Sequence, residues 1–292
     1  MSGYPHLSGS GGRPRSRWLH APGTHFGDGR DEQHCHPDVI LGIVSDLWRV
    51  ADKASERFAA QALDYDRYRP RYPDSVFDDL FESARLTLGD TVIEIGAGTG
   101  IATEPLVDRG LEVTAIEPAA GLASVAESKV ADRARFFVGR FEDFSPDSSV
   151  QLLAAFNAWH WVEPQIAVDL AAQLVKPGGS LALVWTEVVS WGQEPFEERL
   201  AETFGSPWAK REDHVDGSMQ PIRQDDRFDE FQDHHHPFER TLDASTFVAV
   251  TQTYGGNHTA EQYRAIERII NEEFGGVITK VEDAALYLAP RL

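Results

Sequence analysis

Short apolar runs alternate with segments of helical periodicity between residues 90 and 185. Five of these runs are rich in β-branched or other apolar residues and end at turn residues, so each predicts a buried strand. The strands are expected at 91–95, 111–117, 134–139, 150–156 and 180–185. Helices are expected between them, at 101–109, 121–131 and 164–174, with a KPGG turn before the fifth strand. This alternation predicts an α/β protein whose sheet is doubly wound and mostly parallel.

The segment before this core has two different patterns. Residues 1–37 are rich in Gly, Pro, Ser, Arg and His and show no periodicity, which predicts a disordered N-terminal tail. Apolar residues then recur at helical spacing from 38 to about 63. After two prolines, Asp74 or Ser75 is expected to cap a further helix. The predicted domain therefore covers 38–292.

The chain beyond the fifth strand is longer and more polar. Residues 190–232 are acidic, contain a helical stretch at 196–204, and are expected to form a helical cap inserted after that strand. Two more helices are expected, one from Ala244 and one over 259–274. Alternation in 276–290 predicts a strand or hairpin element that closes the sheet.

Charge and composition narrow the classes of partner. The sequence has 47 acidic and 27 basic residues, a formal net charge of -20, and such a surface repels the phosphates of nucleic acids. Cys35 is the single cysteine, which rules out an internal disulfide and fits a reducing compartment. No apolar run approaches the ~20 residues that span a bilayer, and the N-terminus lacks the apolar core of a signal peptide. We therefore expect a cytoplasmic protein with no nucleic-acid or membrane partner, and we expect it to be a monomer or homodimer.

The strongest chemical signal is EIGAGTG at 94–100, directly after the first predicted strand. Glycine at every second position permits positive φ and a close approach of a ligand, and the following helix offers unpaired N–H groups to an anion. A dinucleotide fingerprint would have its third glycine at Ile101, whereas here it is Gly100. Glu117 ends the next strand, where a carboxylate can accept both ribose hydroxyls of an adenosine. A glycine turn alone is also common in tight strand–helix connections.

The E-x-G-x-G-x-G form resembles the first motif of class I S-adenosylmethionine-dependent methyltransferases. The stretches YDRYRPRYP at 65–73, NAWHWVEP at 157–164 and KPGGSLALVW at 176–185 resemble the small-molecule branch that includes trans-aconitate methyltransferase. This resemblance covers roughly 57–291. It implies a Rossmann-like sheet of seven strands in the order 3-2-1-4-5-7-6, with strand 7 antiparallel, and S-adenosyl-L-methionine as the cofactor.

The resemblance also implies roles for individual residues. Phe141 and Glu142 are expected to flank the adenine, and Arg69 to pair with the carboxylate of the cofactor. Glu142 is equally well explained as a solvated loop acid, and Arg69 as a surface residue in a proline-kinked linker. The cofactor-binding residues expected in all are Tyr65, Arg69, Glu94, Gly96, Ala97, Gly98, Gly100, Glu117, Pro118, Phe141, Glu142 and Asn157.

Methyl transfer from a sulfonium is an in-line displacement that needs alignment and exclusion of water, and it needs no metal. A hydroxyl or protonated amine as acceptor would benefit from a general base, and His160 is the candidate because it follows the fourth strand. A carboxylate acceptor would need no base, and a structural histidine is the alternative interpretation. Trp159, Trp161 and Trp185 are expected to line the acceptor pocket, although packing in the core or cap is the alternative interpretation of Trp185.

Two other functions stay open at this point. A methyltransferase-fold protein could bind a metabolite without turnover, since fold does not fix function. A nicotinamide-dependent oxidoreductase is disfavoured by the glycine spacing and by the lack of a Tyr-x-x-x-Lys pair at the usual place. Histidine-rich stretches at 34–36 and 234–236 are not expected to hold a metal, because one lies in a tail and the other alternates along a strand.

Overall fold

The computed structural model describes residues 62–145, 148–205, 212–254 and 258–292. The predicted tail at 1–37, and nearly all of the helix predicted from 38 to 63, lie outside the described residues. The first described helix is α3 (Ala62–Tyr68). In the described part of the chain, no helix combines the length and the apolar character needed to cross a bilayer.

Seven strands form one sheet in the order β3-β2-β1-β4-β5-β7-β6. Strand β7 runs antiparallel to both of its neighbours and the other pairs are parallel, so the order that the resemblance implies is confirmed. The strands are β1 (Thr91–Ile95), β2 (Glu112–Glu117), β3 (Ala134–Val138), β4 (Val150–Phe156), β5 (Val175–Ser190), β6 (Gln232–Asp243) and β7 (Val277–Pro290).

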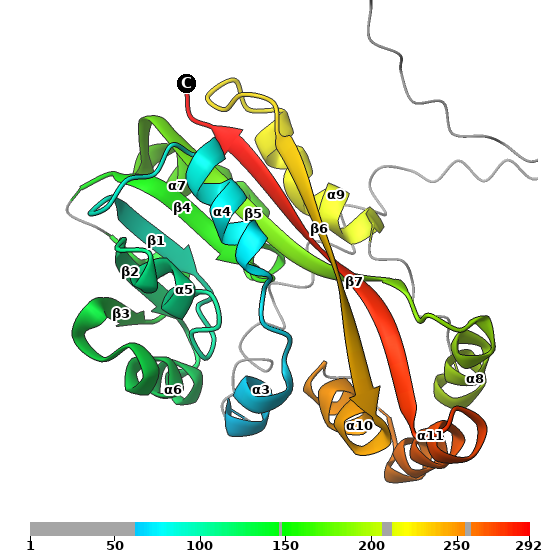
Figure 1. Ribbon diagram of the computed structural model, residues 1–292. Coiled ribbons are helices and arrows are strands. Elements are labelled where there is room, and N and C mark those ends of the chain that lie inside the picture. Colours follow the sequence, from blue (N-terminus) through cyan, green and yellow to red (C-terminus); the bar gives the residue numbers. More distant parts are fainter. Residues whose placement is uncertain (1–61, 146–147, 206–211, 255–257) are drawn as a thin grey trace, which may run out of the picture. The chain divides into compact units, whose positions relative to one another are not determined.

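Helices cover both faces of this sheet, as Figure 1 shows. Successive residues of a strand point to opposite faces, so Val92 packs with the α4 and α5 side while Ile93 packs with the α7 and α9 side. The helices on or near the sheet are α4 (Asp74–Ser83), α5 (Thr103–Asp108), α6 (Ala120–Val130), α7 (Pro164–Leu174) and α9 (Glu212–Arg223). The doubly wound architecture predicted from the alternation is therefore confirmed.

Strand β5 differs from the prediction, because the KPGG segment lies inside the strand. Val150 pairs with Val175 and Leu152 pairs with Ser180, so the residues between Val175 and Ser180 bulge out of the ladder. Gly178 lies in this bulge and has a φ of 78°, which glycine adopts readily. Its N–H donates to the carbonyl of Arg291 at 2.9 Å. The turn residues thus mark a bulge in a longer strand rather than the point where a strand begins.

In the described residues of the segment 190–232, two helices pack in different places. Helix α8 (Glu194–Phe204) joins α10 (Ala244–Thr253) and α11 (Ala260–Glu273) in a separate apolar cluster beside the far ends of β6 and β7 (Figure 1). Helix α9 packs instead on α7 and on the 3-10 turn η4 (Trp159–Trp161). The role of this segment as a cap remains a prediction.

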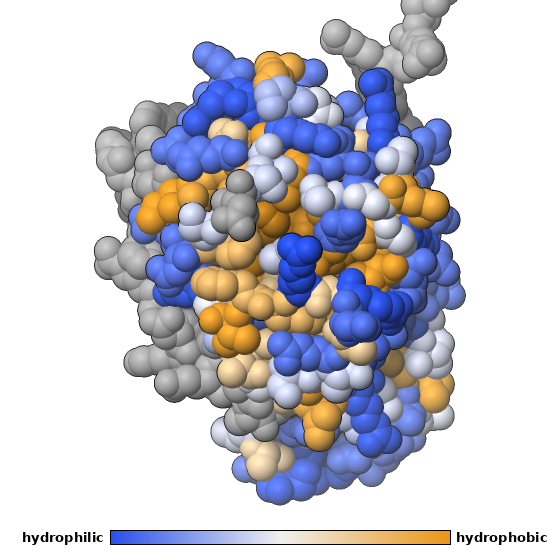
Figure 2. Space-filling view, turned by 90° about the vertical axis from the view of Figure 1, so that its left-hand side faces the viewer, coloured by the Kyte–Doolittle hydropathy of each residue, from blue (hydrophilic) through white to orange (hydrophobic). Residues whose placement is uncertain are grey.

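Strand β3 is the edge of the sheet and is hydrogen-bonded to β2 alone among the described strands. Figure 2 views the molecule from this side and shows hydrophobic residues toward the middle of the face with hydrophilic residues among and around them. Val138 of β3 is 52% exposed. Interspersed charges are a common means of keeping an edge strand from pairing with another chain.

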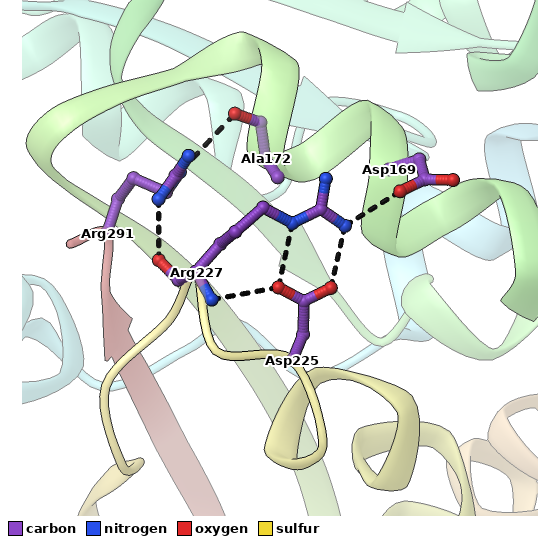
Figure 3. A network of polar contacts seen from close by, with 5 residues as sticks. All are labelled: Asp169, Ala172, Asp225, Arg227 and Arg291. Atoms are coloured by element: carbon purple, nitrogen blue, oxygen red, sulfur yellow. Dashed lines mark hydrogen bonds and ion pairs between the residues drawn. The ribbon is translucent and has the colours of Figure 1, made fainter.

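A network of polar contacts joins Arg291, just after β7, to helix α7 and to the loop at 225–227 (Figure 3). The guanidinium of Arg227 donates through Nε and Nη2 to the two carboxylate oxygens of Asp225, at 2.8 and 2.6 Å, and through Nη2 to Asp169 of α7 at 2.7 Å. Arg291 in turn donates to the carbonyl of Arg227 at 2.8 Å and to that of Ala172 at 3.3 Å. The bidentate pair holds the pKa of Asp225 below its ordinary value.

We expect Arg227→Met to lower the free energy of unfolding by about 1–2 kcal/mol at neutral pH, since it removes charged hydrogen bonds to two carboxylates. The difference should vanish below pH 3.8, as Asp225 is protonated through its lowered folded-state pKa. Arg223→Met is the matched control, because Arg223 pairs with the exposed Asp216, and it should cost less than about 0.5 kcal/mol. Urea unfolding at several pH values measures both; equal losses would contradict the assignment.

Candidate functional site

Two adjoining cavities lie where β1, β2 and β4 end. The larger has an empty volume of about 820 Å³, counting its open mouth, and the smaller about 430 Å³. Both are lined by Tyr65, Gly96, Gly98, Phe156 and Asn157. The larger is also lined by Ile95, Ile116, Glu117, Pro118, Leu122, Arg140, Phe141, Glu142, Ala158, Trp161 and Val162. The smaller adds Arg69, Pro70, Tyr72, Glu94, Ala97, Thr99, Ile101 and Ala102.

The glycines of the 94–100 turn have different tasks. Gly98 has a φ of 58°, and a Cβ atom built there would meet nothing nearer than a ring carbon of Tyr65 at 4.0 Å, so this backbone faces open space. A Cβ atom at Gly100 would come within 3.0 Å of the Cβ atom of Ala126 on α6. Gly100 lines neither cavity, and its lack of a side chain serves the packing of the turn on α6.

Glu117 fixes this turn in place. Its Oε2 accepts the N–H of Gly98 and its Oε1 accepts the N–H of Ala119, both at 2.8 Å. The side chain is buried, which raises its pKa, while the two backbone bonds act in the opposite direction. Each carboxylate oxygen has a further lone pair, so the group can also accept ligand hydroxyls in the larger cavity.

Glu94 is a second buried carboxyl group, on the side of the smaller cavity. It is 1% exposed, and the hydroxyl of Thr103 donates to its Oε2 at 2.6 Å. Burial, with a smaller effect of the nearby Glu117, raises the pKa of Glu94 to about 8. Glu94 is therefore largely protonated at neutral pH, and only one of the two carboxyl groups has to be charged.

Arg69 borders the smaller cavity between two aromatic rings. Its guanidinium carbon lies 4.7 Å from the ring centroid of Tyr65 and 4.3 Å from that of Tyr254, and Nη2 donates to the carbonyl of Thr253 at 3.0 Å. Its Nε is buried and has no hydrogen-bond partner among the described residues. A buried donor of this kind is costly unless a ligand completes it.

Asn157 lines both cavities, and its hydrogen-bond partner Tyr72 lines the smaller one. Asn157 has a φ of 54°, its Oδ1 accepts the N–H of Thr186 at 3.0 Å, and its Nδ2 donates to the hydroxyl of Tyr72 at 2.8 Å. Burial raises the pKa of Tyr72 well above its ordinary value, so its hydroxyl stays protonated. Tyr72 belongs to the 65–73 stretch, which the resemblance places at the methionine end of the cofactor. Phe156, which lines both cavities and whose ring lies 5.2 Å from that of Tyr72, was not among the predicted site residues.

The predicted adenine-side residues are brought together. Pro118, Phe141 and Glu142 all line the larger cavity. Oε1 of Glu142 accepts the N–H of Glu163 at 3.1 Å, so this acid is tied to the loop before α7 rather than left in solvent. Trp161, predicted for the acceptor pocket, lines this same cavity.

Besides Gly100, the predicted residues Trp159, His160 and Trp185 do not line either cavity. Trp159 is 4% exposed and donates to the carbonyl of Ser218 on α9 at 3.2 Å. Trp185 is 2% exposed and donates to Nδ1 of His160 at 3.4 Å. Trp159 and His160 border a separate, smaller space between η4 and α9. A reason for the burial of Trp185 is that β5 runs on to Ser190, which leaves this ring within the strand instead of at its end.

Similarity to known proteins agrees with this arrangement. A family model described as a methyltransferase domain matches residues 93–183. A methyltransferase of Geobacillus kaustophilus, named as uncharacterized, is 30% identical over 155 residues, which cover 50% of this chain and 71% of that relative. The chain belongs to the methyltransferase family. The match includes the glycine turn, Glu117 and Asn157.

Other relatives show how far this likeness extends. An uncharacterized methyltransferase of Mycobacterium tuberculosis is 35% identical to this methyltransferase over 133 residues, 44% of this chain and 53% of that one, so the chain spans about half the length of that relative. A solved structure from Anaeromyxobacter dehalogenans is described as a candidate type II methyltransferase. It matches with a TM-score of 0.59 and 22% identity, and the match covers 77% of this chain and 98% of that one. The YcgJ protein of Bacillus subtilis has a TM-score of 0.51 at 16% identity, covering 75% and 100%. These two structures share the fold.

Glu94→Gln is expected to stabilise this methyltransferase increasingly as the pH rises. A carboxyl group whose folded-state pKa is raised weakens the fold once the unfolded group ionises, so wild type should lose stability from pH 4.5 to about 8. The amide keeps an oxygen that accepts from Thr103 and carries no charge. By urea unfolding, the two proteins should be alike near about pH 4 and differ by on the order of 3 kcal/mol near about pH 8. A difference that does not grow with pH would contradict a buried, protonated Glu94.

Proposed function

We propose that this methyltransferase binds S-adenosyl-L-methionine and transfers its methyl group to a small-molecule acceptor. The observation that carries the proposal is the pair of adjoining cavities around Gly98, with Glu117 hydrogen-bonded to the turn between them. We assign the adenosine to the larger cavity and the amino-acid end to the smaller one.

The residues of the larger cavity suit an adenosine. Glu117 would accept the ribose hydroxyls, and Glu142 the amino group of the adenine. Phe141 and Pro118 supply the apolar surface against which a purine ring packs.

The residues of the smaller cavity suit the amino-acid end. The unpartnered Nε of Arg69 is a donor that a carboxylate would satisfy with a charged hydrogen bond. An ammonium group near Glu94 would favour the ionised form of that carboxyl group. Tyr65 and Phe156 line both cavities and would shield the reacting carbon from water.

The bound cofactor would supply a methyl group already activated by a sulfonium. The chain then has to orient the acceptor and keep water out, and orientation accounts for at most about 7–11 kcal/mol of the barrier. The proposal covers O-, N- and carboxyl-methylation. The stretches at 65–73 and 157–164, which resemble the trans-aconitate methyltransferase branch, support a small-molecule acceptor. His160 is retained as the candidate base for acceptors that carry a proton, and its ring would have to turn toward the cavities to act.

Ligand binding distinguishes the cofactor from its alternatives. S-adenosylhomocysteine should raise the melting temperature of the full chain and NADH should not, because the glycine spacing does not provide a dinucleotide turn. Cell extract incubated with the protein and deuterated-methyl cofactor should then yield a labelled product by mass spectrometry. Binding without any labelled product would favour a silent metabolite-binding protein, and stabilisation by NADH alone would favour an oxidoreductase.

Gly98→Val is expected to weaken S-adenosylhomocysteine binding at least about tenfold, because the branched side chain fills the space assigned to the ligand. Gly89→Val is the matched control, since Gly89 also has a positive φ and open space around it but lies before β1, away from both cavities. Calorimetry should show nearly unchanged affinity for the control. Equal affinities for the two variants would refute this placement of the ligand.

A further inference from the structure

Arg69 borders the smaller cavity and contacts residues from the C-terminal part of the chain. These residues lie beyond the range 93–183 that the family model matches. Arg69 follows α3 and is 184 positions from Thr253, whose carbonyl accepts its Nη2 at 3.0 Å. The ring of Tyr254, which ends α10, lies against the guanidinium at 4.3 Å. The C-terminal end of α10 therefore fixes both the position and the orientation of the Arg69 guanidinium.

Tyr254 is itself backed by a buried ion pair. Nζ of Lys280 lies 5.9 Å from the centroid of its ring and 2.7 Å from Oε1 of Glu282, and both charged residues are 1% exposed. Oε2 of Glu282 accepts Nη1 of Arg240 at 3.2 Å. Nη2 of Arg240 reaches the carbonyl of Tyr68 at 3.4 Å. The contacts thus form a closed ring from α3 through α10, β7 and β6 back to α3.

This ring accounts for the state of Arg69. A guanidinium held between two tyrosine faces loses little additional freedom when it binds an anion. One backbone carbonyl takes Nη2, and Nε remains buried without a partner among the described residues. The cation is thus presented to the smaller cavity with its orientation fixed and part of its hydrogen-bonding capacity unused.

We propose that Tyr254 and the Thr253 carbonyl position Arg69 for the carboxylate of the cofactor, so that the C-terminal β6–α10–α11–β7 segment sets affinity for the amino-acid end. The inference rests on the proposed function, because it assumes the adenosyl sulfonium ligand in these cavities. Tyr254 is a positioning residue here, since it touches Arg69 and lines neither cavity.

The test compares two ligands that differ at this end. S-adenosylhomocysteine carries the carboxylate, and 5′-methylthioadenosine keeps the adenosine and the sulfur but lacks it. Tyr254→Leu should raise the Kd of S-adenosylhomocysteine about tenfold and change that of methylthioadenosine by less than about twofold. Tyr254→Phe keeps the ring face and should bind both ligands nearly as wild type does.

Two controls separate positioning from general damage. Tyr263→Leu removes another tyrosine of the same helical cluster, one that packs on Phe204, and should leave the ratio of the two Kd values unchanged. In an Arg69→Met background, Tyr254→Leu should have less than about a twofold further effect on S-adenosylhomocysteine. Tyr254→Met is measured in parallel and should reproduce the Leu variant, which covers the case of an insoluble Leu protein.

The outcomes are distinct for the two proposals. Wild-type protein that binds neither ligand would overturn the proposed function and this inference with it. Wild-type protein that binds S-adenosylhomocysteine, with Tyr254 variants that bind it equally well or lose both ligands in equal measure, would overturn the inference alone.

Discussion

The arrangement of the site depends on one buried carboxylate. Glu117 ends β2 and accepts N–H groups from Gly98 and Ala119, so it joins the turn after β1 to the start of α6. A buried carboxyl group is tolerated when several donors satisfy it, and backbone N–H groups are donors that every residue except proline supplies. The same residue borders the larger cavity. The group that would bind the sugar is therefore also the group that shapes the turn next to it.

The environment of Glu94 explains why this carboxyl group stays neutral. Burial is the main cause of the raised pKa of Glu94, and the nearby Glu117 adds a smaller effect in the same direction. Burial also raises the pKa of Glu117, but two backbone N–H groups act in the opposite direction there. Glu94 has one hydroxyl donor, from Thr103, and keeps its proton at neutral pH. The two buried acids thus differ in their hydrogen-bond partners, and a cationic ligand near Glu94 would favour the ionised form of that group.

Local patterns predicted much of the fold and part of the site. The bounds of β1, β4 and α7 were predicted to the residue, since apolar runs ended by turn residues specify buried parallel strands, and the pocket residues around the glycine turn follow from motif spacing. Long-range contacts were not predictable in this way. Whether Trp185 faces the site or the core depends on the length of β5 against β7, which is set by pairing across about 100 residues of chain. The same holds for the neighbours of Arg69.

The matched residues 93–183 and the rest of the chain contribute differently to the two cavities. Residues 93–183 provide the turn, Glu117 and, apart from Tyr65, the walls of the larger cavity, to which we assign the adenosine. The smaller cavity is completed by the segment around Arg69, and that segment is fastened by Arg240, Thr253 and Tyr254 from elements outside the matched domain. Because a buried ion pair costs desolvation and is a weak source of stability, the Lys280–Glu282 pair is better explained by what it holds in place than by the fold energy it adds. Under the proposed function, residues outside 93–183 would then set affinity for the amino-acid end of the ligand, while the matched residues would hold the adenosine.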